Sequence, residues 1–270
     1  MRLVITKMNL GLWAAAYVRQ TINAAAPAPD KPFVLGLPTG GTVIDMYANL
    51  RQFNKADELS FKNVVTFNMD EYVGLPEDHP QSYHSYMNAN LFDAVDINRQ
   101  NVHILNGNAE DLNQECADYE ASIAAAGGVD LFLGGVGRNG HLAFNEPGSA
   151  FDTRTRPVSL TPSTIEANAR FFLNDPAKVP THALTVGIGT VTDAKEVLIL
   201  ASGEKKAMAV KQLLEREPTT EWPVSALRRH PHATVLADLS ACSLLTRENQ
   251  DKLRALTQAA PDAEHWTLEF

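Results

Sequence analysis

The chain has little cysteine and no long uninterrupted apolar run. Its two cysteines, Cys116 and Cys242, are too few for a disulfide framework and lack the spacing of zinc ligands, so we expect two reduced thiols. No apolar run approaches the roughly 20 residues that span a bilayer. The N-terminal stretch lacks a cleavable signal pattern, because Lys7, Asn9 and Arg19 interrupt it. These absences predict a cytoplasmic protein without a membrane partner.

Basic residues are also scarce relative to acidic ones. The 270 residues include 23 Lys and Arg against 32 Asp and Glu, a formal net charge of −9, so a large basic surface for nucleic acid is not expected. A small anionic ligand is still compatible with this charge, because anion sites are local and often built from backbone N–H groups. The hydrophobic fraction of 44% is ordinary for a globular protein. We expect a small-molecule partner and no nucleic acid.

Short apolar runs alternate with helical patterns along most of the chain. The apolar runs cover 33–37, 63–67, 101–105, 129–135, 183–189, 196–202 and 233–239. The helical patterns cover 42–55, 81–92, 111–126 and 204–215. Strands that are apolar on consecutive residues, each followed by a helix, indicate a parallel sheet covered on both faces. We predict a Rossmann-like, mostly parallel α/β fold in a single domain, 1–270. The segment of about 148–182, with one helical pattern at 162–172, is predicted to be a lid-like insertion.

Ligands of such a sheet bind outside the carboxyl ends of its strands, and the first loop there is Thr39-Gly40-Gly41-Thr42. Exposed N–H groups, hydroxyls and a helix start with Thr42 as N-cap are typical of an anion site. No lysine follows Gly41, so the loop is not a Walker A motif and an ATPase or kinase is not expected. A plain strand-to-helix turn is the structural alternative, and a phosphate monoester site is the favoured interpretation.

A second loop, Ser202-Gly203 followed by Lys205 and Lys206, has the same strand–turn–helix form. Adjacent lysines on a helix point in different directions, so we expect only one of them to face the ligand as a point charge for a phosphate. Arg170, inside the insertion, is a second candidate cation, or alternatively a surface arginine.

Asp70 and Glu71 directly follow a strand that is predicted to be buried. Consecutive side chains point apart, so we expect only one carboxylate to face the ligand. A partly desolvated aspartate at a strand end suits a general base that removes a carbon-bound proton. A turn or helix-capping aspartate is the structural alternative.

The stretch 135–140 spells G-x-G-x-x-G, the letters of a dinucleotide fingerprint. Pro147 and the glycine after it would break the helix that this motif requires, and Asp152 follows no strand. A nicotinamide or flavin cofactor is therefore not expected. Neither is a metal, because the remaining histidines show no ligand spacing. The loop is better interpreted as a glycine turn that presents His141 and Glu146 for acid/base chemistry.

Several motifs together resemble the glucosamine-6-phosphate deaminase family, from about residue 30 to 240. They are GLPTGGT, VVTFNMDEYVGL, HPQSYHSYM, GGVGRNGHLAFNEPG, ARFF and ALTVGIGT. The two longest distinguish the deaminases from related 6-phosphogluconolactonases of the same fold. The resemblance implies an isomerising hydrolase of amino-sugar catabolism, including N-acetylglucosamine degradation. It converts glucosamine 6-phosphate and water into fructose 6-phosphate and ammonia without a redox or metal cofactor. It also implies a homo-oligomer, a hexamer in some members.

The resemblance further implies roles at matching positions. Asp70 is the base that moves a proton from C2 to C1, His141 passes a proton to the ring oxygen, and Glu146 is the partner of that histidine. The phosphate-binding positions are Thr39, Gly40, Gly41, Thr42, Arg170 and Lys206.

Two departures from the family pattern stand out. Asn139 replaces an aspartate of many members, so it lacks the charge that would raise the pKa of the histidine, although it can hold the ring by hydrogen bonding. Ser149 and Arg156 match an allosteric site for N-acetylglucosamine 6-phosphate, but Val158 replaces its lysine. We therefore predict weak or absent activation by that compound.

Three alternatives are kept. They are a 6-phosphogluconolactonase-like hydrolase, a deaminase of the galacto epimer, and a non-catalytic regulator that binds sugar phosphates. The combination of Asp70, His141 and Glu146 argues against the regulator, because mere binding does not require an acid/base set.

Overall fold

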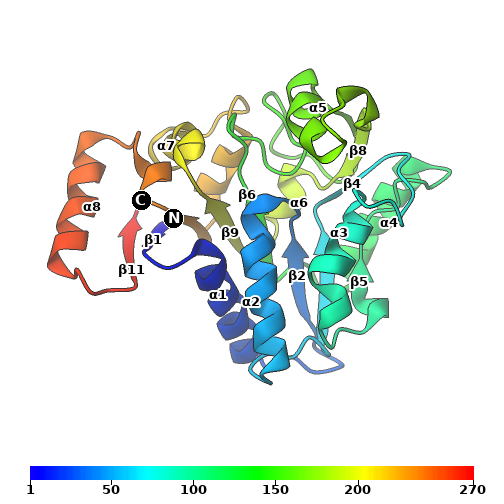
Figure 1. Cartoon of the computed structure of the whole chain (residues 1–270), viewed down its shortest axis with the longest axis horizontal. Helices are drawn as coiled ribbons and strands as arrows, with labels where there is room; N and C mark the ends of the chain where they lie inside the picture. The colour runs from blue at the N-terminus through cyan, green and yellow to red at the C-terminus, as the bar shows by residue number, and fades with distance from the viewer.

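The computed structural model describes residues 1–270 and is built on an eight-stranded sheet in the order β11-β1-β10-β9-β6-β2-β3-β5. Its strands are β1 Arg2–Thr6, β2 Phe33–Leu37, β3 Val64–Asn68, β5 Val102–His103, β6 Leu131–Gly135, β9 Glu196–Ala201, β10 Ala233–Ala237 and β11 His265–Glu269. Every neighbouring pair is parallel except β1 with β11. The predicted mostly parallel sheet is confirmed. The chain ends lie side by side at its edge (Figure 1).

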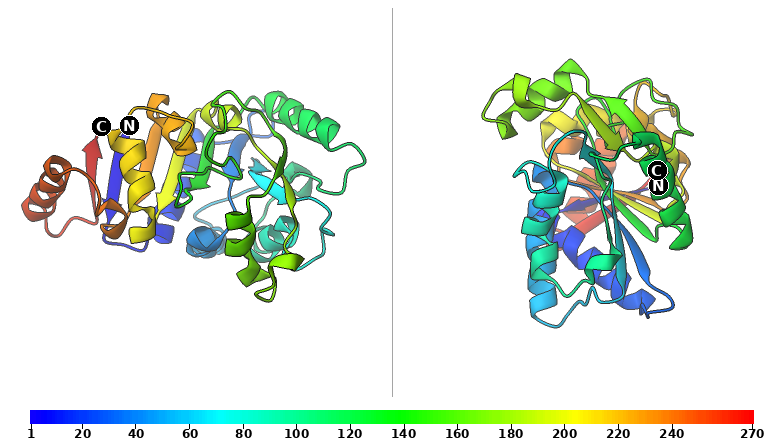
Figure 2. Two further views of the ribbon diagram at one scale, coloured as in Figure 1. Left: turned by 90° about the horizontal axis from the view of Figure 1, so that it is seen from above. Right: turned by 90° about the vertical axis from the view of Figure 1, so that its right-hand side faces the viewer.

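Helices cover both faces of this sheet, as predicted (Figure 2). The helices that pack on one face are α1 Leu10–Ala25, α2 Ile44–Lys55 and α3 Tyr83–Asn90. Those that pack on the other are α4 Leu112–Ala125, α6 Ile188–Thr192, α7 Ala207–Glu215 and α8 Arg247–Ala259. Along β9, Val197 and Ile199 enter one apolar core while Leu198 and Leu200 enter the other. Two buried faces explain why the strands are apolar on consecutive residues.

The predicted strand at 183–189 is not part of the parallel sheet, so this prediction was wrong. Residues His182–Thr185 form β8, the centre of a small antiparallel sheet between β4 (Asp70–Tyr72) and β7 (Arg156–Ser159). Leu184 packs into a main core, whereas Ala183 packs into a separate cluster. Burial on both sides gives β8 the apolar composition of a central parallel strand, so composition alone misassigns it.

Residues 148–182 contain β7, helix α5 (Pro162–Asn168) and two helical turns, η4 Ala169–Phe171 and η5 Pro176–Lys178. Helix α5 and η4 together account for the predicted helix at 162–172. This segment lies on the side to which β2 points (Figure 1). Its apolar contacts form a small cluster of their own, made by Tyr72, Leu160, Ala169, Phe172, Val179 and Ala183.

The remaining short helical turns connect these elements. They are η1 Gly41–Val43, η2 Phe92–Ala94, η3 Arg99–Asn101, η6 Glu204–Lys206, η7 Pro223–Arg229 and η8 Ser240–Cys242. No helix in the structure combines the length and apolarity needed to cross a membrane.

Candidate active site

The predicted site residues gather at the carboxyl ends of the central strands. Strand β6 pairs with both β2 and β9, and β2 also pairs with β3. The loops that follow these four parallel strands therefore leave the same edge of the sheet next to one another. They carry the glycine-threonine loop, Asp70, the loop around His141, and the lysine turn before α7.

The loop after β2 leaves backbone donors open to an anion. Gly40 has φ of 107°, and neither η1 nor α2 has a side-chain cap. A Cβ built on Gly40 or Gly41 would meet no atom within 4 Å, so the space beside this turn is empty. The prediction that Thr42 caps the helix was wrong: Thr42 lies inside η1, and α2 begins only at Ile44. The uncapped turn retains N–H groups for a phosphate.

Three cations, Lys206, Arg138 and Arg170, lie near one another, and the first two follow neighbouring strands of the same sheet edge. Lys206, in η6, is partly buried while Lys205 is exposed, which agrees with the expectation that only one lysine turns inward. Burial lowers the pKa of Lys206, and the nearby positive charges of Arg138 and Arg170 lower it further. Such repulsion favours binding of an anion. Sequence reasoning missed Arg138; the signal was its position just after β6, the neighbour of the strand that leads to Lys206.

Asp70 and Glu71 have separate environments, as expected from their alternation along β4. Asp70 is 7% exposed, and burial, followed by the charge of Glu71, raises its pKa to about 8. Glu71 turns toward the start of α3, where it accepts the N–H groups of Tyr83 and His84, both at 3.0 Å. Its Oε2 also lies 2.8 Å from His84 Nδ1. The capping role considered for Asp70 thus falls to Glu71.

The glycines after β6 shape the turn that carries His141. The N–H of Gly137 donates to the His141 carbonyl at 2.9 Å, and Gly140 has φ of 80°. A Cβ on Gly137 would fall 2.3 Å from atoms of the His141 ring, so only glycine fits. No helix follows before Pro147. The interpretation as a glycine turn rather than a dinucleotide loop is confirmed.

Glu146 lies beside His141 but is bonded to other groups. Its Oε2 is 3.7 Å from His141 Nδ1 and accepts a hydrogen bond from Asn139 Nδ2 at 2.7 Å. Its Oε1 accepts one from Thr164 Oγ1 at 2.5 Å. Burial alone would raise the pKa of Glu146. The proximity of His141 and the hydrogen bonds from Thr164 and Asn139 instead lower it to about 2. Glu146 is therefore ionised at neutral pH.

Asn139 does not hold the histidine ring, which corrects the expectation from sequence. Its amide nitrogen donates to Glu146, and its oxygen accepts the backbone N–H of His141 at 3.3 Å. The His141 Nδ1 is buried and has no hydrogen-bond partner. The amide is engaged elsewhere because the carboxylate of Glu146 is the stronger acceptor.

The two positions considered for an effector site flank the same loop. Ser149 Oγ donates to the Glu146 carbonyl at 2.7 Å. Arg156 donates to Asn145 Oδ1 at 2.8 Å, and burial lowers its pKa. Val158 pairs with Ala183 between β7 and β8. The guanidinium of Arg156 therefore already has an internal partner.

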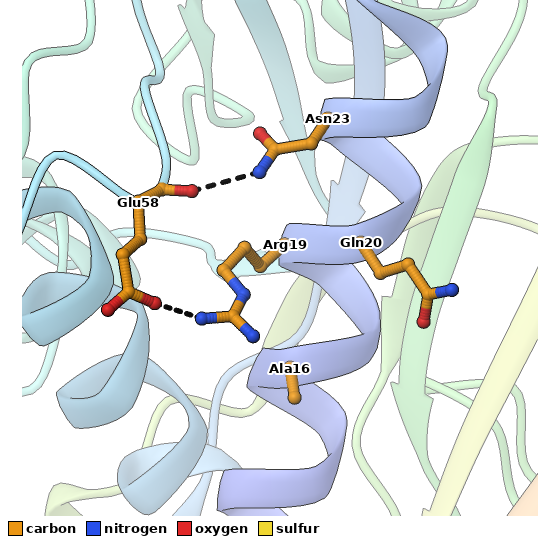
Figure 3. A pocket seen from close by; sticks show the side chains of 5 residues that line it. All are labelled: Ala16, Arg19, Gln20, Asn23 and Glu58. Carbon is orange, nitrogen blue, oxygen red and sulfur yellow. Dashed lines mark hydrogen bonds and ion pairs between the residues drawn. The ribbon is translucent and has the colours of Figure 1, made fainter.

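A hollow beside α1 is chemically different from this site. It is lined by Ala16, Arg19, Gln20, Asn23 and Glu58 (Figure 3). Arg19 pairs with Glu58, whose carbonyl also accepts a hydrogen bond from Asn23 at 2.9 Å. It lies toward the amino ends of the strands, because Glu58 comes between α2 and β3. Nowhere in the structure do three His, Cys, Asp or Glu side chains form a group that could hold a metal ion.

Comparison with known proteins gives one consistent match. The family described as glucosamine-6-phosphate isomerases/6-phosphogluconolactonase matches residues 6–236. A glucosamine-6-phosphate deaminase of Phocaeicola vulgatus is 57% identical over 243 residues, which cover 89% of this chain and 92% of the relative. One from Drosophila pseudoobscura pseudoobscura is 54% identical over 243 residues, with 89% of each chain covered.

Solved structures agree with this match. A monomeric glucosamine-6-phosphate deaminase superposes with a TM-score of 0.85 at 43% identity, over 90% of this chain and 100% of the other. A 6-phosphogluconolactonase of Thermotoga maritima has a TM-score of 0.69 at 20% identity, over 87% and 98%, and shares the fold alone. The family match spans most of the sequence, and the chain belongs to the glucosamine-6-phosphate isomerase and 6-phosphogluconolactonase family.

Proposed function

We propose that this chain is a glucosamine-6-phosphate deaminase, which converts glucosamine 6-phosphate and water into fructose 6-phosphate and ammonia in amino-sugar catabolism. Relatives of that name are more than half identical over about nine tenths of the chain. One observation carries the proposal: the buried Asp70 lies at the same edge of the sheet as two other loops. These are the open glycine loop of residues 39–42 and the turn that carries His141. A carbon acid bearing a phosphate suits this arrangement.

In this proposal the phosphate rests on the loop of residues 39–42. The phosphate oxygens accept hydrogen bonds from backbone N–H groups of the uncapped turn. Lys206, Arg170 and Arg138 supply the positive charge. A phosphate fixed at one end orients the sugar, so the reacting carbons meet the same side chains at each turnover. Arg138 is an addition to the set of phosphate ligands expected from sequence.

Proton transfer is then divided between the two remaining loops. His141 donates a proton to the ring oxygen and opens the pyranose. The 1-hydroxyl loses its proton as the ring opens to the aldehyde. Asp70 then removes the proton at C2 and returns it at C1, while the aldehyde oxygen gains a proton and the amino group loses one. The product is the imine of the ketose, which water hydrolyses to the ketose and ammonia. A base with a pKa of about 8 is well matched to a weakly acidic C–H bond near neutral pH. Glu146, ionised and 3.7 Å from His141, stabilises the protonated ring.

The segment 148–182 acts as a lid in this proposal. Its helix α5 contacts the catalytic loop through Glu146, and its Arg170 lies near the phosphate cations. Closure over the sugar would exclude water from the enolisation step. A cytoplasmic location and a homo-oligomeric state remain predictions. A solved relative is described as monomeric, and sedimentation at micromolar concentration would distinguish a monomer from a hexamer.

The test is product analysis with three substrates. Purified protein is incubated with glucosamine 6-phosphate, galactosamine 6-phosphate or 6-phosphogluconolactone, and ammonia, ketose phosphate and 6-phosphogluconate are measured. We expect ammonia and fructose 6-phosphate in equal amounts from the first substrate. Asp70→Asn should slow the reaction by roughly a hundredfold or more, whereas Asp78→Asn, at an exposed position nearby, should leave the rate unchanged. Formation of 6-phosphogluconate from the lactone, with no ammonia from either amino sugar, would instead establish the lactonase alternative.

A further inference from the structure

Glu146 connects two segments that are separate in sequence. Its Oε2 accepts a hydrogen bond from Asn139, within the loop that carries His141. Its Oε1 accepts one from Thr164, which lies on α5 in the segment 148–182. The glutamate therefore bridges the catalytic loop and the helix that lies over the strand ends.

The hydroxyl of Thr164 is oriented toward Glu146 by its neighbour Thr161. The Thr161 side chain caps α5 and accepts the backbone N–H of Thr164 at 3.3 Å. Its hydroxyl lies 3.0 Å from Thr164 Oγ1, 3.0 Å from Ser163 Oγ and 3.5 Å from Glu146 Oε1. Thr164 itself donates to Glu146 Oε1 at 2.5 Å. The hydroxyls at the start of α5 thus form one network beside the carboxylate.

His141, by contrast, is left without a hydrogen-bond partner on its buried Nδ1. Glu146 is the acidic side chain that pairs with it, and the 3.7 Å separation is longer than a hydrogen bond. The other groups around the carboxylate, Asn139, Thr161 and Thr164, are all neutral. The carboxylate of Glu146 is thus hydrogen-bonded to neutral donors on both segments instead of to the ring. They are Asn139 on the catalytic loop, and Thr164 and the more distant Thr161 at the start of α5.

We propose that Thr164 is a positioning residue that acts through Glu146 on His141, so that the position of α5 determines how strongly the carboxylate engages the ring. While α5 lies against the catalytic loop, Thr164 holds Glu146 just beyond hydrogen-bond distance. Loss of this donor, by substitution or by movement of α5, frees Glu146 to bond Nδ1–H and to favour the protonated ring. The consequence for catalysis rests on the proposed function, whereas the coupling itself does not.

The experiment compares Thr164→Val with Thr164→Ser and with the matched control Ala167→Ser, at an exposed position of α5. The titration of the His141 ring is followed by NMR in the ligand-free protein, and its signals are assigned by their absence in His141→Gln. We expect the His141 ring of Thr164→Val to take up its proton about one pH unit higher than that of the wild type. A new charge-assisted hydrogen bond from the ring to Glu146 can produce a shift of this size. Thr164→Ser and Ala167→Ser should titrate like wild type.

An unshifted or lowered titration in a folded Thr164→Val protein, checked by its thermal midpoint, would overturn the proposal. The same shift should be found in the acidic limb of the kcat/KM profile, and a limb that stays in place would refute the catalytic consequence. Because the NMR titration requires no turnover, it decides the coupling even if the protein forms no ammonia.

Discussion

Replacing Asp70 by asparagine is expected to stabilise the fold at neutral pH while removing the proposed base. Burial and the charge of Glu71 raise the pKa of Asp70 from 3.8 to about 8. Between about pH 4 and pH 8, Asp70 is therefore protonated in the folded protein and ionised in the unfolded chain. With the folded pKa above the unfolded one, the associated stability is complete below about pH 4 and is lost as the pH rises toward 8. Asparagine is neutral throughout and avoids this loss.

The size of the effect follows from the shift. Each pKa unit corresponds to 1.36 kcal/mol, so the roughly three units between 3.8 and pH 7 amount to about 4 kcal/mol. For a chain of this length, 1 kcal/mol moves the thermal midpoint by about 2–4 °C. Asp70→Asn should therefore melt roughly 10 °C above wild type at pH 7.

Thermal unfolding of the ligand-free proteins from pH 4 to pH 8 measures this difference. The gap in Tm should be near zero at pH 4 and widen steadily toward pH 8. A gap that does not depend on pH, or a wild type that is the more stable protein at pH 7, would refute the reasoning.

The neighbouring carboxylate provides a matched comparison with the opposite sign. Glu71→Gln also removes one negative charge from β4, but this charge accepts the N–H groups of Tyr83 and His84 at the start of α3. Loss of hydrogen bonds to a charged group costs about 1.5–3 kcal/mol, so Glu71→Gln should melt below wild type at pH 7. Destabilisation by both substitutions would contradict the assignment of separate roles.

Three further predictions concern binding, pH dependence and regulation. Asn139→Asp places a second carboxylate against Glu146 and should raise the pKa of that glutamate from about 2. The acidic limb of the kcat/KM profile should then move to higher pH, and an unchanged limb would contradict this prediction. Lys206→Met should raise KM for glucosamine 6-phosphate about tenfold or more with little change in kcat, whereas exposed Lys205→Met should leave both unchanged. N-acetylglucosamine 6-phosphate should barely shift the wild-type substrate curve and should shift that of Val158→Lys; clear activation of wild type would show the effector prediction to be wrong.

Much of the architecture was predictable because it depends on burial on two faces. Val197 and Leu198 enter opposite cores, and this burial on both faces produces the consecutive apolar residues that favour a covered parallel sheet. The elements near the two chain ends, β1, α1, α8 and β11, were not predicted, and neither was the small antiparallel sheet. The apolar residues of β8 do not reveal whether their partner strands are parallel, since the pairing partners lie far away in sequence.

The site was predictable where a loop follows a buried strand, as for Asp70 and the glycine turn before His141. Side-chain direction was not, since hydrogen bonding decides it in three dimensions. Asn139 turns to Glu146 instead of the histidine ring, and Thr164 reaches the same carboxylate from 18 residues further along the chain. Arg138 joins Lys206 only because β6 and β9 are neighbours in the sheet.

The role of Asp70 as the base is tested by the turnover of Asp70→Asn with glucosamine 6-phosphate, measured together with the affinity of this variant for the substrate. If the buried Asp70 is the base, kcat should fall by roughly 10²–10⁴. The calorimetric Kd should stay near that of the wild type, since the phosphate is held by other residues. A variant that releases ammonia within tenfold of the wild-type rate would contradict the account.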